Sequence, residues 1–311
     1  DLSLRRKVLQ TLQVATQTPH SHTYGEDLEQ MVWEDTNDII AMYLDILPKA
    51  ENEVIQDIEE QKIWFVKRFE KKPPEKISEL SEVLRSNAAY EMFKVFVGYD
   101  GRLEPDYDFE RDREARSKKV DEFVGAISDS NFEEWRTKIL SVVKNYSVSE
   151  PGSYGYFEAF LFKLGSDKTG LAIRLAEENE KELAPFLINL LSGIWKSNVV
   201  RAKKMIVDWI EAGKYLPAWA FIFVVTDDLD EPLLQQVVRR AKKQKDILAL
   251  NNTLRSILHH YPKNKHLRSS FIYVIDELSK LKSYLWIDSL WFRANPILDD
   301  LEERDWNAIF G

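Results

Sequence analysis

The sequence predicts an all-α protein whose C-terminal half is an α-solenoid of antiparallel helix pairs, preceded by longer helices in the N-terminal part. Gly and Pro are scarce, at 11 each in 311 residues, which leaves little room for a turn-rich β fold. Apolar residues recur at three- and four-residue spacing, as on one face of a helix. From about residue 131 onward, helix pairs recur at a step of roughly 30 to 33 residues, which is typical of helical repeats.

The first hundred residues predict three long helices, over 26–47, 54–69 and 77–97. Pro48 and the pair at 73–74 separate them, because proline cannot continue a helix. Glycine at position 98 ends the third, since glycine readily adopts the left-handed conformation that closes a helix.

The stretch 99–110 is acidic, polar and contains proline, which indicates a linker. It divides an N-terminal helical domain or cap, residues 1–98, from a helical-repeat domain, residues 111–311. A charged helix over 111–127 is expected to open the second domain. The chain stops directly after an aromatic, helix-like segment, so we expect the repeats to continue in a longer protein.

The second half predicts a regular series of helices. Their expected starts lie near Phe132, Gly152, Lys168, Lys181, Asn198, Tyr215, Glu231, Asp246, Lys263, Tyr284 and Pro296. In each pair an amphipathic helix precedes a more apolar one, which would form the inner layer because it is touched on more sides. Most tryptophans of this half are expected in the core. The alternative is a compact helical bundle in which the spacing is accidental.

Composition excludes several kinds of chemistry. The chain has no Cys, which excludes disulfides, thiol catalysis and Cys-ligated metals, and which fits the reducing cytoplasm where we place the protein. No apolar run approaches 18 residues, so no membrane-spanning helix is expected. Glycine-rich phosphate loops and the serine elbow of hydrolases are absent, so we expect no cofactor.

The histidines give little support for a metal or catalytic site. His20 and His22 are expected in an exposed loop, and they could hold a metal only with ligands from elsewhere. His259 and His260 are expected at a helix end, where the helix dipole favours a partly charged imidazole. An enzyme whose catalytic residues are dispersed in the sequence stays an alternative.

Charge is distributed unevenly along the chain. The net charge is −9, yet residues 196–268 hold 14 Lys and Arg against 7 Asp and Glu. The candidate partner-binding residues of this stretch are Arg201, Lys203, Lys204, Arg239, Arg240, Lys242, Lys243, Lys245, Lys263, Lys265 and Arg268. On stacked helices they could form a stripe that receives nucleic acid or an acidic protein surface. The alternative is a solvated outer face whose charges pair with acidic helix caps.

Residues 131–305 resemble helical-repeat proteins of the HEAT, armadillo and tetratricopeptide kind in layout. The tetratricopeptide consensus of Trp-x-x-Leu-Gly is not met, because residues 209–213 read Trp-Ile-Glu-Ala-Gly. The segment is also similar to the helical arms of large bacterial defence proteins with NTPase or NAD-hydrolase domains. That resemblance implies a sensing arm, with the catalytic domain elsewhere in the protein.

These observations lead to a primary functional expectation, a scaffold or sensor module that binds a protein partner on the repeat surface. Nucleic-acid binding through the basic stretch 196–268 is the second. No membrane partner is expected, and a homo-oligomer could form through the rest of a longer chain. Fold alone does not imply function, so these remain expectations.

Overall fold

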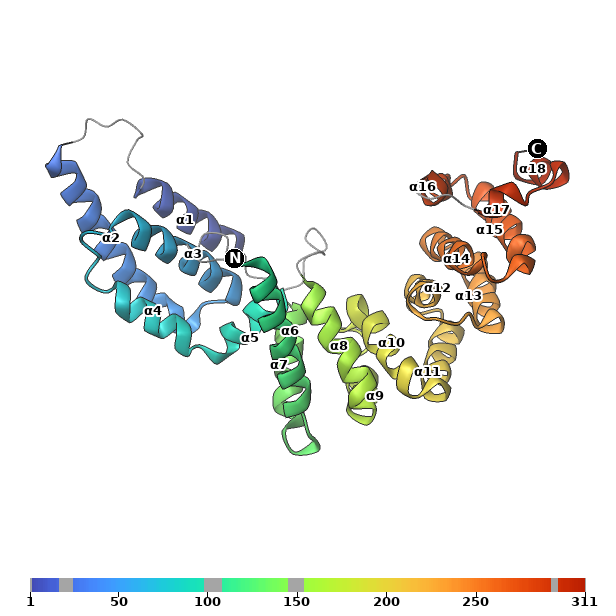
Figure 1. Cartoon of the computed structure of the whole chain (residues 1–311), viewed down its shortest axis with the longest axis horizontal. Helices are drawn as coiled ribbons and strands as arrows, with labels where there is room; N and C mark the ends of the chain where they lie inside the picture. Colours follow the sequence, from blue (N-terminus) through green and yellow to red (C-terminus); the bar gives the residue numbers. More distant parts are fainter. Residues whose placement is uncertain (1, 17–24, 98–107, 145–153, 292–295, 311) are drawn as a thin grey trace. The chain divides into compact units, whose positions relative to one another are not determined.

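The computed structural model describes residues 2–16, 25–97, 108–144, 154–291 and 296–310 (Figure 1). All regular structure within these ranges is α- or 3-10 helix, so the predicted all-α class is confirmed. No helix in the described ranges is both long and apolar enough to span a bilayer.

The described residues form two compact units. The first lies within residues 1–122 and 145–157, and the second within 123–144 and 158–311. The predicted linker at 99–110 falls outside the described residues except for its last three, of which Phe109 and Glu110 already belong to a helix. The domain limits drawn from the sequence stay a prediction.

The first unit is built from long helices around α3. Its helices are α1 (Leu2–Ala15), α2 (Glu26–Ile46), α3 (Asn52–Arg68), α4 (Ile77–Ser86), α5 (Ala88–Val97) and most of α6 (Phe109–Ala126). Helix α3 contacts α1, α4 and α5, and its Val54, Ile55 and Ile58 are buried in the core.

The single helix predicted over 77–97 is wrong, because α4 and α5 are separate. Asn87 adopts an extended conformation between them, and its side-chain oxygen accepts a hydrogen bond from the Tyr90 backbone N–H at 3.1 Å. Asparagine competes with helix continuation in this way and acts as a cap for the helix that follows.

Buried polar side chains in the first unit bond to one another. The Tyr43 hydroxyl donates to Gln61, whose amide donates to the Leu9 carbonyl at 3.0 Å. Glu59 accepts from the Tyr90 hydroxyl at 2.7 Å and pairs with Lys94. Burial, with the nearby negative charge of Asp57, raises the pKa of Tyr43. These contacts join α1, α2, α3 and α5, so the cluster has a structural role.

The second unit is a series of shorter helices. They are the end of α6, α7 (Phe132–Lys144), α8 (Gly155–Asp167), α9 (Thr169–Glu178), α10 (Leu187–Ser197), α11 (Val199–Ala212), α12 (Leu216–Val225), α13 (Glu231–Gln244), α14 (Ile247–His260), α15 (Arg268–Lys280), α16 (Trp286–Trp291), α17 (Pro296–Asp299) and α18 (Glu303–Phe310). Short 3-10 turns precede α7, α10 and α15.

Most helix starts in this unit follow the sequence prediction within a few residues. Asn198, Asp230 and Asp246 cap α11, α13 and α14, each accepting a hydrogen bond from the backbone N–H three residues later. The helix expected to start near Lys181 begins later in the structure. Helix α10 starts at Leu187, after a 3-10 turn that contains Pro185.

Contacts between helices follow a repeating order. Helices α10, α12 and α14 each contact the helix that precedes them and the helix that follows them in the sequence. Helix α12 also contacts both α10 and α14, and Figure 1 shows α12, α13 and α14 together. Helix α12 is apolar around its whole circumference, and Trp219, Ile222 and Phe223 are fully buried. A helix with no polar face is expected to be largely covered, and in α12 only the last residue, Val225, is exposed.

A row of polar side chains on α14 joins it to α12. Asn252 donates to the Pro217 carbonyl at 2.9 Å, and Ser256 donates to the Ala220 carbonyl at 2.6 Å. One turn further, His260 Nε2 lies 2.6 Å from the Phe223 carbonyl oxygen. Since a carbonyl only accepts, Nε2 carries the proton.

Candidate functional site

The eleven candidate cations fall into three groups rather than one line. Arg201, Lys203 and Lys204 lie near the start of α11. The group at 239–245 occupies the C-terminal end of α13, and the group at 263–268 precedes and opens α15. The first and third groups are thus at helix starts and the second at a helix end. The structure does not bring all eleven together.

Five of the candidate cations form ion pairs with carboxylates of other elements. The pairs are Arg201–Glu177, Lys203–Asp230 at 2.6 Å, Lys242–Glu277 at 2.9 Å, Lys265–Asp300 at 2.6 Å, and Arg268 with Glu302 at 3.1 Å and with Asp305. Two carboxylates of the acidic segment 299–303, Asp300 and Glu302, thus meet the third cationic group.

The pKa values of the partners respond to these contacts. Hydrogen bonds to Tyr273 and Glu277 raise the pKa of Lys242. Burial acts to raise the pKa of Glu277, but hydrogen bonds from Lys242 and Lys280 outweigh it, so the pKa of Glu277 is lowered. These cations hold neighbouring helices together, although exposed pairs of this kind contribute only about 0–1 kcal/mol each.

The other six cations form no ion pair within the described parts of the chain. They are Lys204, Arg239, Arg240, Lys243, Lys245 and Lys263. Those at the end of α13 lie where the partial negative charge of a helix C-terminus favours cations. Lys245 has a further structural role, since its left-handed backbone (φ 56°) closes α13.

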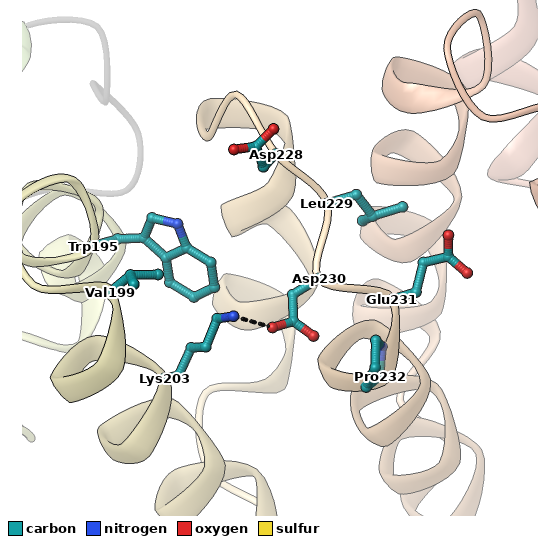
Figure 2. Close-up of a pocket in the computed structure, with 8 residues that line it drawn as sticks. All are labelled: Trp195, Val199, Lys203, Asp228, Leu229, Asp230, Glu231 and Pro232. Carbon is teal, nitrogen blue, oxygen red and sulfur yellow. Dashed lines mark ion pairs between the residues drawn. The ribbon is translucent and has the colours of Figure 1, made fainter.

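An open hollow of about 580 Å³ lies between α10, α11 and the segment that leads into α13. Its lining residues are Trp195, Val199, Lys203, Asp228, Leu229, Asp230, Glu231 and Pro232 (Figure 2). Trp195 stands on one side, with Leu229 opposite, and the Lys203–Asp230 ion pair joins the two sides. The hollow combines an aromatic ring, apolar side chains and several charges.

Local structure fixes the polar groups of this hollow. Asp230 is both the N-cap of α13, bonded to the Leu233 N–H at 3.0 Å, and the partner of Lys203. The Lys203 Nζ also lies 5.4 Å from the centroid of the Trp195 ring. Glu231 points away from Trp195 in Figure 2 and contacts His266 instead.

Exposed apolar side chains occur in the lining of the hollow and in the sequence near it. Val199, which lines it, is 39% exposed, and its neighbour Val200 is 76% exposed. Val225, the last residue of α12, is 51% exposed. An exposed apolar side chain in the lining of a hollow is a candidate contact for a partner, whereas single exposed apolar residues elsewhere are ordinary.

Sequence reasoning missed this hollow. Trp195 was expected in the core, and it is only half-buried, whereas Trp209, Trp219 and Trp286 are buried. The helix start predicted near Glu231 is confirmed, with Asp230 as its cap.

The histidines do not assemble a metal site. His20 and His22 lie outside the described residues. His260 is buried and bonded to α12, so its role is structural, but its partner is a carbonyl of another helix rather than its own helix dipole. Among the described residues, no group of three or more His, Asp and Glu could hold a metal ion.

Comparisons of the chain with protein-family models, with curated proteins and with solved structures give no match. The site is therefore interpreted from its own geometry.

Proposed function

We propose that the second unit is a segment of an α-solenoid scaffold that binds a protein partner at the surface around the Trp195 hollow. The observation that carries this proposal is the hollow with its exposed lining residue Val199, together with the exposed Val200 next to it in α11 and the exposed Val225 three residues before Asp228. Protein interfaces combine such an apolar centre with a polar rim.

The order of the helix contacts supports the scaffold part of the proposal. Inner helices α10, α12 and α14 follow one another, while α11 contacts α13 on the outer layer. In a solenoid each repeat contacts only its neighbours, and the stacked helix ends form an extended surface for partners. Cations on α11, α13 and α15 pair with neighbouring helices, so part of the positive charge serves this stacking.

Affinity capture from cells of the source organism tests the proposal. The bait is the whole chain, compared with a variant in which all three valines become serine, and with Leu248→Ser as the matched control. Leu248 is also exposed (55%) but lies at the start of α14. A captured protein is then purified, and its affinity for each variant is measured at physiological salt.

We expect the captured partner to bind the wild type and Leu248→Ser equally, and the triple variant at least tenfold more weakly, because a hydrophobic contact of roughly 1.5–3 kcal/mol is lost per fully buried valine. Equal binding of all three proteins would contradict the placement of the site. Circular dichroism of each variant checks that the helices are retained.

Nucleic-acid binding is the second candidate, and one observation favours it. Arg239, Lys243 and Lys245 are exposed at the end of α13 and form no ion pair in the described parts of the chain. The test is a salt titration with labelled duplex and single-stranded DNA. Binding at low salt that falls steeply with salt, and that is lost when Arg239, Arg240, Lys242 and Lys243 become Gln, would support this candidate.

The similarity to helical arms of bacterial defence proteins, the cytoplasmic location and the homo-oligomer remain predictions from the sequence. An upstream NTPase or NAD-hydrolase domain in the full-length protein would support the sensor form of the scaffold proposal.

A further inference from the structure

We infer that the Trp195 hollow binds a cationic side chain, arginine or lysine, of a partner polypeptide. This inference rests on the proposed protein-binding function and names the chemistry of the partner. Its basis is the combination of an indole ring, uncompensated carboxylate charge and a hollow of about 580 Å³ in one place.

The hollow already holds one cation, and that cation shows how the site works. The Lys203 ammonium lies 5.4 Å from the Trp195 ring centroid and 2.6 Å from an Asp230 oxygen. An aromatic ring attracts a cation through its electron-rich face, and a carboxylate adds direct charge attraction. The same two kinds of group would receive the cation of a partner.

The charge of the lining residues favours a cation over an anion. Lys203 compensates Asp230, and Glu231 is engaged by His266. Asp228 forms no ion pair in the described parts of the chain, and its backbone is held by a hydrogen bond from the Thr226 hydroxyl at 3.2 Å. An incoming carboxylate would meet like charge at Asp228, whereas a guanidinium or ammonium would compensate it.

The apolar part of the hollow fits the stem of the same side chain. Val199 presents aliphatic surface beside the ring of Trp195, and Leu229 presents aliphatic surface on the opposite side of the hollow. Arginine and lysine place their methylene stems along apolar surface and keep the charged end among polar groups. The volume lies within the range of pockets that hold small molecules, so it admits a side chain together with part of the neighbouring peptide.

Removing the Lys203 ammonium should change the affinity for a basic ligand and for an acidic ligand in opposite directions. In Lys203→Met, Asp230 becomes available to the partner and the hollow carries one more uncompensated negative charge. A basic ligand should then bind more tightly, although an ion pair has been removed from the protein. If the hollow received an acidic ligand, the same substitution would weaken binding.

Two matched peptides serve as probes. One is an acetylated and amidated nonapeptide with two arginines flanked by leucines and carrying a fluorescent label; in the other, both arginines are glutamates. Binding to the whole chain is followed by fluorescence anisotropy at low and at physiological salt. The perturbation of the Trp195 indole N–H resonance, assigned by its loss in Trp195→Phe, reports whether the peptide occupies the hollow.

Each variant has a matched control on α11. Lys204→Met makes the same change in net charge outside the lining of the hollow, because Lys204 is exposed and forms no ion pair in the described parts. Asp208→Asn, also exposed on α11, is the control for Asp228→Asn.

We expect the arginine peptide to bind Lys203→Met about fivefold more tightly than wild type and Asp228→Asn about fivefold more weakly, which is the change that about 1 kcal/mol of ion pairing gives. Both controls should stay within twofold of wild type. Preference for the glutamate peptide, equal effects of Lys203→Met and Lys204→Met, or no peptide binding to any variant would overturn the inference. A captured partner that still depends on the three valines would then leave the proposed function standing.

Discussion

Gly165 and Gly193 face each other where α8 crosses α10. A Cβ atom added to Gly193 would lie 2.9 Å from the Gly165 Cα, and closer still to the Phe162 carbonyl oxygen. Both obstacles are backbone, which cannot swing aside as a flexible side chain can. Only glycine at both positions permits these helices to approach so closely.

Gly193→Ala should therefore destabilise the second unit. Overpacking of this kind costs about 1–3 kcal/mol, which outweighs the better helix propensity of alanine. Urea unfolding followed by circular dichroism measures the change. The matched control is Gly170→Ala on α9, where an added Cβ meets nothing within 4 Å, and it should leave the unfolding free energy unchanged or raise it. A stable Gly193→Ala protein would contradict the close crossing.

The polar row on α14 gives a second prediction. Ser256 is fully buried and donates to the Ala220 carbonyl of α12 at 2.6 Å. Ser256→Ala removes the donor and leaves space in a tight contact, so we expect a loss of about 0.5–1.5 kcal/mol in urea unfolding. Ser269→Ala, on the exposed start of α15, should change the unfolding free energy by less. Equal small effects would show that the row does not hold α12 to α14.

Glu277 should make the stability of the second unit depend on pH. Its side chain is only 8% exposed and pairs with Lys242 and Lys280. Despite the opposing effect of burial, those contacts lower the pKa of Glu277. Since the folded protein favours the ionised form, this stabilisation is present above the unfolded pKa, about 4.3 for a glutamate, and is lost as the pH falls through the folded value.

Thermal unfolding of the wild type and Glu277→Gln at pH values between 7 and 3 measures this contribution. The wild type should melt higher at pH 7, and the difference should shrink below about pH 4.3. Glu211→Gln, at an exposed carboxylate of α11 that forms no ion pair in the described parts, should follow the wild type at each pH. A difference between wild type and Glu277→Gln that grows toward acid would contradict the assigned sign.

The helices were predictable where local chemistry decides them. Asn198, Asp230 and Asp246 are good capping residues, and the structure starts helices directly after them. The break at Asn87 was missed because its neighbours continue the apolar helical pattern, and only the capping hydrogen bond to Tyr90 decides the outcome.

The roles of the charged residues were less predictable, because ion pairs depend on which helix ends meet in space. Lys242 and Glu277 are 35 residues apart in sequence, so no local pattern joins them. The Trp195 hollow likewise combines the end of α10 and the start of α11 with the segment that leads into α13. A half-buried indole leaves no distinct mark in the sequence. The sequence predicted the excess of Lys and Arg in residues 196–268, but not which carboxylates they pair with.

Site-specific photo-crosslinking tests the central proposal, a protein partner at the hollow, most directly. A photoreactive phenylalanine analogue replaces Val200 (76% exposed) in cells of the source organism, and Leu248 in the control. The proposal predicts a defined protein adduct from position 200 and none from position 248. Adducts with nucleic acid alone, or the same adducts from both positions, would contradict it.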